Sequence, residues 1–225
     1  MEKGLNILEV DSVEMNYGAN RLLSDIYLKC RQGEITGILG RNGSGKSTLL
    51  KIIFGILPAD SASVRINGAT LSSGYIKDRL IAYLPQHHFI PPSMKVSQAL
   101  SIYGVDIQTA CGLLPEIEKL LSAKPVQLSG GEHRLIEILL VLYSRSKFCL
   151  LDEPFSGLSP VMMESVVDLV NQARISKGIL ITDHHYRQVT KMSDTLYMLV
   201  NGQARMVTHS DELIRYGYVP DRDQV

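Results

Sequence analysis

Short, continuously apolar runs alternate along this chain with longer stretches in which apolar residues recur at helical spacing. The runs have the length and content of strands buried on both faces, and they occupy Glu34–Leu39, Leu80–Leu84, Phe148–Leu151 and Gly178–Thr182. A helical pattern over Ser47–Phe54 follows the first run after a glycine-rich turn. This alternation predicts an α/β protein with parallel strands.

Turn and cap residues mark further elements. Asn67-Gly68 and Asn201-Gly202 each separate two β-like runs, and they predict tight hairpin turns because both positions favour positive φ. Ser159 and Pro160 suit the N-cap and the first position of a helix. One face of that helix carries the apolar residues Met162, Val166, Leu169, Val170 and Ala173.

The pattern changes between residues 87 and 127. His87–Pro92 has the composition of a loop, and two or three short helical stretches follow with little strand character. The sequence shows no internal repeat and no low-complexity linker. We therefore expect an inserted helical lobe within this chain of 225 residues.

Composition narrows the class of protein. Hydrophobic residues make up 45% and charged residues 20% of the chain, so a packed core is expected. Lys+Arg and Asp+Glu both number 23, so a basic surface that coats nucleic acid is not expected. The most apolar stretch, Leu135–Tyr143, contains Glu137 and is shorter than the roughly 20 residues that cross a bilayer. The three cysteines are far apart and predict neither a disulfide framework nor a zinc site, as in a soluble protein of a reducing compartment.

Residues Gly40–Ser47 match the phosphate-loop pattern G-x-x-x-x-G-K-[ST] between a predicted strand and a predicted helix. Glycines let successive N–H groups turn toward phosphate oxygens, and the helix N-terminus adds partial positive charge. Lys46 would bring a full charge to the β- and γ-phosphates, and Ser47 a hydroxyl to Mg²⁺. The alternative is a glycine-rich turn with a solvated lysine, which accounts for fewer of these features.

Two carboxylates, Asp152 and Glu153, follow the strand predicted over Phe148–Leu151. In a parallel sheet, functional groups gather at the carboxyl ends of the strands, beside the phosphate loop. Asp152 suits the Mg²⁺ shell, and Glu153 suits orienting or deprotonating a water that attacks the γ-phosphate. Alone, the pair would be interpreted as a solvated turn before Pro154; the phosphate loop favours the functional interpretation.

Leu128-Ser-Gly-Gly-Glu132 resembles the signature motif of ATP-binding cassette (ABC) ATPases. The order of phosphate loop, glutamine, signature, acidic strand and histidine is also similar to the order in that family, over roughly residues 5–207. The resemblance implies the ATP-hydrolysing subunit of an ABC transporter, with ATP and Mg²⁺ as its ligands. The implied fold is a phosphate-loop NTPase (RecA-like) α/β core with an N-terminal antiparallel β subdomain and an inserted helical subdomain. Residues 1–86 and 146–225 would form the core, and 87–145 the helical subdomain, of a single ABC ATPase domain.

The resemblance also assigns roles to individual residues. Tyr17 matches the aromatic residue that stacks on adenine, and a core tyrosine at a strand edge is the alternative. Gln86 matches the glutamine that senses Mg²⁺ and water, and His184 matches the histidine at the γ-phosphate, with His185 as the competing choice. The implied catalytic residues are Glu153, His184 and Gln86, and the implied Mg²⁺ ligands are Ser47, Gln86 and Asp152. Nucleotide binding is assigned to Tyr17, Gly40, Arg41, Asn42, Gly43, Ser44, Gly45, Lys46, Ser47, Thr48, Ser129, Gly130 and Gly131.

Four histidines are a further candidate for metal binding. A site built from His87, His88, His184 and His185 is possible on residue type alone. Neighbouring histidines on loops usually lack ligand geometry, and no cysteine or carboxylate cluster accompanies these. We therefore expect no metal other than Mg²⁺.

The signature residues predict a second anion-binding helix end. Ser129 and the backbone of Gly130 and Gly131 precede a helix predicted over Glu132–Tyr143. In the family this end caps the γ-phosphate held by the opposite subunit, so that two ATP molecules lie between two cassettes. The resemblance therefore implies a second cassette, either a copy of this chain or a paralogue, which ATP joins and hydrolysis releases.

Two positions depart from the family pattern. Ser159 stands where the family usually has aspartate; it can cap the next helix but lacks the charge used between subunits. Ile138–Leu142 occupies a stretch where Ala-Arg-Ala is common, and it is either core or an altered partner surface. Neither departure removes a catalytic group, so an active ATPase is expected.

Three functions remain for comparison. The leading one is the cytoplasmic subunit of a transporter, peripheral on the membrane, which docks on transmembrane permease subunits. The apolar residues of the lobe around Phe89–Tyr103 would form the docking groove or, equally, the core of the lobe: Ile90, Pro91, Met94, Val96 and Leu100. The alternatives are a soluble ABC ATPase outside transport, such as an iron–sulfur assembly protein, and a regulatory ATP-binding module with little turnover. Neutral charge and the lack of a long coiled-coil insertion argue against the DNA and translation branches, so no nucleic acid partner is expected.

Overall fold

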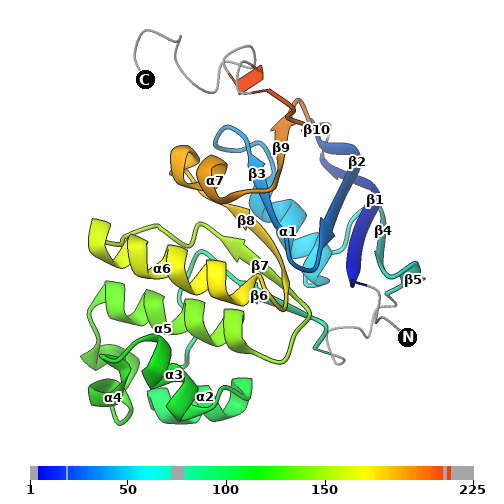
Figure 1. Cartoon of the computed structure of the whole chain (residues 1–225). Coiled ribbons are helices and arrows are strands. Elements are labelled where there is room, and N and C mark those ends of the chain that lie inside the picture. The colour runs from blue at the N-terminus through cyan, green and yellow to red at the C-terminus, as the bar shows by residue number, and fades with distance from the viewer. Residues whose placement is uncertain (1–4, 19, 72–78, 210–211, 214–225) are drawn as a thin grey trace, which may run out of the picture.

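The computed structural model describes residues 5–18, 20–71, 79–209 and 212–213 (Figure 1). The strands in this part of the chain are β1 (Ile7–Tyr17), β2 (Asn20–Arg31), β3 (Ile35–Leu39), β4 (Ser61–Ile66), β5 (Ala69–Thr70), β6 (Ile81–Leu84), β7 (Phe148–Asp152), β8 (Gly178–Thr182), β9 (Thr195–Val200) and β10 (Gln203–Met206). The helices are α1 (Lys46–Phe54), α2 (Val96–Tyr103), α3 (Ile107–Leu113), α4 (Ile117–Leu120), α5 (Gly130–Tyr143), α6 (Pro160–Ala173) and α7 (Tyr186–Met192), with a 3₁₀ turn η1 (Pro125–Gln127).

The four apolar runs of the sequence form the centre of the larger sheet. Its strand order is β10-β9-β3-β8-β7-β6, and all neighbours are parallel except β10 and β9. Along β7, Phe148 and Leu150 face one core while Cys149 and Leu151 face the other, and all four are fully buried. Burial on both faces explains why these strands are continuously apolar, and the predicted α/β class is confirmed.

A smaller antiparallel sheet lies on one side of this centre. Its order is β2-β1-β4-β5, and α1 packs between the two sheets (Figure 1). Asn67-Gly68 joins β4 to β5 with φ of 52° and 78°, and Asn201-Gly202 joins β9 to β10 with φ of 49° and 76°. Both predicted hairpins are therefore confirmed, with both central residues left-handed.

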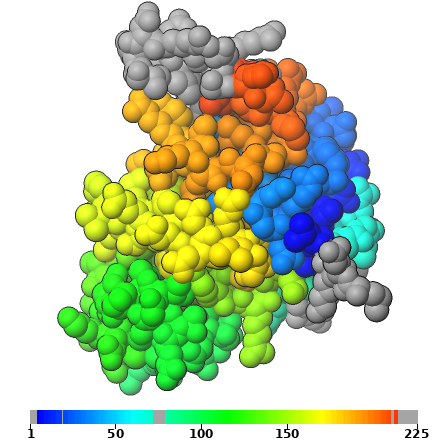
Figure 2. Space-filling view, viewed as in Figure 1, coloured from blue at the N-terminus to red at the C-terminus, as the bar shows by residue number. Residues whose placement is uncertain are grey.

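Helices α5 and α6 pack against each other on the other side of the large sheet, and the lobe of α2, α3, α4 and η1 packs on α5. In Figure 2 this lobe is the green part of the surface, below the yellow and orange core. The helical segments predicted between residues 87 and 127 are thus confirmed. Ile90, Val96 and Leu100 are at most 6% exposed within the lobe, so these three are core and not docking surface. The subdomain boundaries at 87 and 145 stay a prediction.

Capping residues decide where the two long helices begin. α5 starts at Gly130, two residues before the expected start, because Ser129 Oγ accepts from Glu132 N at 3.2 Å and the Glu132 carboxylate accepts from Ser129 N at 2.7 Å. α6 starts at Pro160 as predicted, and Ser159 Oγ accepts from Met162 N at 3.4 Å. Residues 138–142 are fully buried, so that stretch of α5 is core.

Candidate functional site

Three strand ends and one loop converge at the carboxyl edge of the large sheet. The phosphate loop follows β3, Gln86 follows β6, Glu153 follows β7 and His184 follows β8. Since β3, β8, β7 and β6 are adjacent and parallel, these residues meet at one edge. They line a single cavity of about 240 Å³, together with Leu22 and loop residues 42–48.

Two glycines of the loop lie where no side chain fits. Gly45 caps α1 with a φ of 101°, and a Cβ there would lie 2.9 Å from Leu23 Cδ2. A Cβ on Gly40 would lie 2.8 Å from Leu199 O. The close approach of β2 and β9 to the loop therefore requires glycine at both positions.

Lys46 is held against its own loop. Its ammonium donates to Gly40 O at 2.6 Å and to Arg41 O at 3.2 Å, and only 6% of the residue is exposed. Burial lowers the pKa of Lys46, while the carboxylates of Glu153 and Asp152 act in the opposite direction. The cation is thus fixed at the floor of the cavity.

The chemistry of the next group fits Mg²⁺. Asp152 is fully buried; its Oδ1 accepts from Ser47 Oγ and its Oδ2 from Tyr83 OH, each at 3.0 Å. Burial raises the pKa of Asp152, and the hydrogen bonds from Ser47 and Tyr83 partly oppose this. Gln86 Nε2 donates to Ser47 Oγ at 2.9 Å. The hydroxyl of Ser47 and the carboxylate of Asp152 are hard oxygen donors of the kind that Mg²⁺ prefers, and the Gln86 amide would add its oxygen by turning over. A cation would favour the ionised form of Asp152.

Glu153 receives two polar side chains on one oxygen. Gln86 Nε2 donates to Glu153 Oε1 at 2.9 Å, and His184 Nε2 lies 2.7 Å from the same atom. The backbone of Glu153 has a φ of 52°, which is uncommon for a residue other than glycine. The structure therefore brings together the three residues that the sequence assigns to catalysis.

The two histidines after β8 have different surroundings. His184 lines the cavity beside Glu153. The His185 ring instead makes an edge contact with the ring of Phe155, and the backbone N–H of His185 donates to Asp183 Oδ1 at 2.9 Å. The geometry therefore favours His184 over His185 as the residue at the γ-phosphate.

Tyr17 and the signature lie apart from this cavity. Tyr17 ends β1 and is 55% exposed, so it is not a core tyrosine, and its ring is accessible for stacking. Ser129, Gly130 and Gly131 form the N-terminus of α5 and are not among the described residues that line the cavity. A Cβ on Gly131 would lie 2.5 Å from Met162 Sδ, so α6 packs directly on this turn.

Sequence reasoning missed the residues that hold these groups in place. Arg134 of α5 donates to Pro85 O at 2.7 Å and to the carbonyls of Asp152 and Glu153 at 2.9 Å. Glu137, one turn further along, is fully buried. Its position inside an apolar run was the available signal, because a buried carboxylate needs partners.

His88, His133 and Glu137 place three possible metal-ligand atoms within 4.8 Å of one another. However, the two rings stack with centroids 3.8 Å apart and planes 5° from parallel. An ion cannot lie in the planes of two parallel rings, so this arrangement is not a chelate. Burial lowers the pKa of His133, with Glu137 opposing the shift, which favours a neutral stacked ring. Of the four histidines weighed from the sequence, only His88 belongs to this group, which is the one such group among the described residues.

A phosphate loop after β3, with a buried aspartate and a glutamate at the end of β7 in the same parallel sheet, defines a nucleoside triphosphate hydrolase. The chain belongs to the ABC transporter family, whose model matches residues 23–156. Within that family it is an ATP-binding subunit and an ATPase.

Relatives and solved structures support this assignment. The chain is 32% identical to the probable branched-chain amino acid transport ATP-binding protein LivF of Archaeoglobus fulgidus, over 91% of this chain and 94% of the relative. It is also 32% identical to the lipopolysaccharide export system ATP-binding protein LptB of Escherichia coli, over 86% of each. A solved structure of the ATP-binding subunit of an ABC transporter superposes with a TM-score of 0.83 at 25% identity, covering 96% of this chain and 95% of that chain. Among the described residues, no helix combines the length and apolar content needed to span a membrane.

Proposed function

We propose that this chain pairs with a second cassette around two Mg-ATP and drives transmembrane permease subunits from the cytoplasmic face of the membrane. The observation that supports this proposal is the composition of the cavity. It is lined by the phosphate loop, Gln86, Glu153 and His184, whereas the signature residues 129–131 lie outside it. Such a site is incomplete on its own. The N-terminal end of α5 can bind an anion, but it does not face the cavity in which this chain would hold its own nucleotide.

Each residue has a defined part in the proposed hydrolysis. Tyr17 stacks on adenine, and the N–H groups of the loop and Lys46 hold the phosphates. Ser47, Asp152 and Gln86 would hold Mg²⁺, which supplies positive charge to the β- and γ-phosphate oxygens. Glu153 orients the attacking water and accepts its proton.

His184 and the signature complete the proposed site. His184 lies beside both Glu153 and the loop, so it can contact the γ-phosphate while keeping the carboxylate oriented. Ser129, Gly130 and Gly131 of the partner cassette would cap that phosphate from the opposite side. ATP is then part of the interface, and its hydrolysis removes the bridging group.

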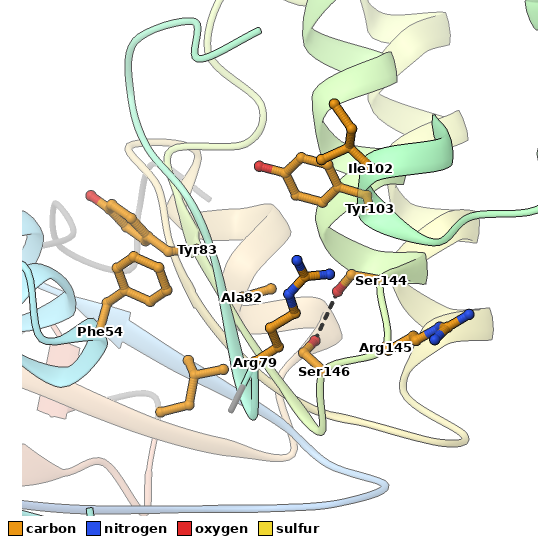
Figure 3. A pocket seen from close by; sticks show the side chains of 10 residues that line it. Phe54, Arg79, Ala82, Tyr83, Ile102, Tyr103, Ser144, Arg145 and Ser146 are labelled. Atoms are coloured by element: carbon orange, nitrogen blue, oxygen red, sulfur yellow. Dashed lines mark hydrogen bonds between the residues drawn. The ribbon is translucent and has the colours of Figure 1, made fainter. Parts of the chain in front are cut away.

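A groove between the core and the lobe is the proposed docking surface for the membrane subunit. It has a volume of about 260 Å³ and is lined by Phe54, Ile81 and Tyr83 of the core and by Ile102 and Tyr103 of α2 (Figure 3). Arg79 extends toward the space between the two tyrosines, whereas Arg145 points away from it (Figure 3). An amphipathic helix could insert an apolar side chain here, at the junction between the lobe and the core.

The docking proposal is tested by co-purification. Tagged Glu153→Gln protein is recovered with ATP and Mg²⁺ from gently solubilised membranes, and its partners are identified by mass spectrometry. A stoichiometric multi-span protein is expected. Ile102→Asp, at a groove residue that is 53% exposed, should lose it, and Ile175→Asp, at a residue 80% exposed outside the groove, should keep it. Recovery of soluble assembly factors alone, with a control transporter extracted intact, would contradict the transport role.

The pairing proposal has a separate test. Glu153→Gln with ATP and Mg²⁺ should sediment as a dimer, and adding Ser129→Arg should return it to a monomer by blocking the capping turn. A monomer at high protein concentration without the second change would rule out a homodimer and favour a paralogous cassette.

A further inference from the structure

Helix α5 reaches the catalytic strand ends through one buried guanidinium. The side chain of Arg134 is 4% exposed, and Nη1 donates to Pro85 O at 2.7 Å. Nη2 donates to both Asp152 O and Glu153 O at 2.9 Å. One planar group therefore ties the residue before Gln86 to the main chain of the two acidic residues.

The same helix holds the other side of the glutamine loop. Glu137 Oε1 accepts from Phe89 N at 2.6 Å and from Ile90 N at 3.4 Å, and Oε2 lies 2.9 Å from His88 Nδ1. Arg134 Nη1 is 3.8 Å from Glu137 Oε2, so the two charges compensate each other inside the protein. Gln86 is thus attached to α5 on both sides, at Pro85 and at residues 88–90.

The bond to the carbonyl of Glu153 falls where the backbone needs support. Glu153 has a φ of 52°, a conformation that persists only when its surroundings hold it. Glu153 N donates to Thr182 O at 2.8 Å, and Arg134 holds the carbonyl of the same residue. Both peptide groups around the proposed catalytic carboxylate are therefore fixed.

We propose that Arg134 is a positioning residue for ATP hydrolysis, which sets the main chain at Pro85, Asp152 and Glu153 so that Gln86 and Glu153 face the γ-phosphate, with Glu137 as its counter-charge and second anchor. The inference rests on the roles proposed above for Gln86 and Glu153. Arg134 is not among the residues that line the cavity, and its hydrogen bonds go to Pro85, Asp152 and Glu153 and not to the phosphate loop, so it acts on the rate of hydrolysis and not on nucleotide affinity.

A buried ion pair with a purely structural role predicts a different result. Removing one partner would leave the other charge unpaired and lower stability, and removing both would restore it. The rate of folded enzyme at saturating ATP would then be normal in the double variant. A positioning role predicts that the rate defect remains when stability returns.

The experiment compares Arg134→Met, Arg134→Met/Glu137→Gln and Arg134→Lys in steady-state hydrolysis over a range of ATP concentrations up to saturation, with thermal melting of each. We expect kcat to fall about tenfold to a hundredfold in both methionine variants, because small displacements of catalytic groups carry costs of this size, with KM for ATP within about threefold of normal. The double variant should melt higher than Arg134→Met and keep its rate defect. Arg65→Met, at a partly buried pair with Asp11 in the small sheet, is the matched control and should leave kcat unchanged.

Arg134→Lys keeps the charge and covers the case in which the methionine variants do not fold. The compact ammonium of lysine cannot donate to all three carbonyls at the ends of two strands, as the planar guanidinium does. We therefore expect kcat to fall about threefold to tenfold at unchanged KM. A normal kcat in Arg134→Lys, or its return in the double variant, overturns the proposal. Glu153→Gln in the same assay tests the proposed function separately: its normal turnover would overturn the assignment of Glu153 and this inference with it.

Discussion

The phosphate loop and the strand-end cluster line the same cavity but are built in different ways. The loop is a single segment, Gly40–Ser47, whose glycines and backbone N–H groups provide the binding surface. The cluster takes Gln86, Glu153 and His184 from the ends of three strands. Arg134, from α5, holds the main chain at Glu153 and at Pro85, next to Gln86. Binding here depends on local geometry, and catalysis depends on tertiary geometry, so the two should be separable by mutation.

The largest expected effect comes from the loop itself. Lys46→Ala removes the ammonium charge intended for the β- and γ-phosphates, so both ATP binding and turnover should fall below detection. A fluorescent-nucleotide titration and a phosphate-release assay measure the two. Lys119→Ala, an exposed lysine of α4, is the control and should behave normally. Normal turnover in Lys46→Ala would contradict the assignment of the loop.

The next effect separates the cluster from the loop. Glu153→Gln keeps the shape and the contact with Gln86 but removes the base, so kcat should fall by about 10² to 10⁴. ATP affinity should stay close to normal because the loop is intact. Equilibrium ATP binding and steady-state hydrolysis, measured on one preparation, give both values. If ATP affinity fell as much as kcat, the division between binding by the loop and catalysis by the cluster would be wrong, because the Glu153 carboxylate would then contribute to binding.

The smallest expected effect concerns the residues proposed for Mg²⁺, which lie between the phosphate loop and the strand-end cluster. Tyr83→Phe removes the hydroxyl that donates to Asp152 Oδ2 but keeps the ring that packs against Phe54. A hydrogen bond to a charged group contributes about 1.5 to 3 kcal/mol, part of which water can replace, so half-maximal activity should need about three to ten times more Mg²⁺. Tyr143→Phe makes the same change away from the site and should not alter the Mg²⁺ requirement. An unchanged requirement in Tyr83→Phe would show that this bond does not support the site.

The same division explains how much the sequence could predict. The loop is contiguous, and the apolar runs gave the strands whose ends carry Asp152 and Glu153, so these parts followed from pattern and topology. Gln86 and His184 came from the family resemblance, because a lone glutamine or histidine on a loop carries no signal of its own.

The residues that escaped prediction depend on packing between distant segments. Arg134 and Tyr83 act through bonds to main chain and side chains far away in sequence, and no spacing rule reveals such bonds. The spacing of Ile90, Val96 and Leu100 is compatible with either core or surface, and only the packing of the lobe on α5 shows that they are buried. Glu137 is the exception, since a carboxylate in an apolar helix already implies a buried partner.

The contacts of Lys46 with its own loop have a consequence for the cost of binding nucleotide. Gly40 O and Arg41 O accept from the ammonium at 2.6 and 3.2 Å, and an ammonium has three N–H donors, so one donor is left for a phosphate oxygen. The side chain is already ordered by these bonds, so little of its rotational freedom remains to be lost when a phosphate binds. The loop thereby prepares its own cation in advance, and less of the binding energy is spent on ordering it.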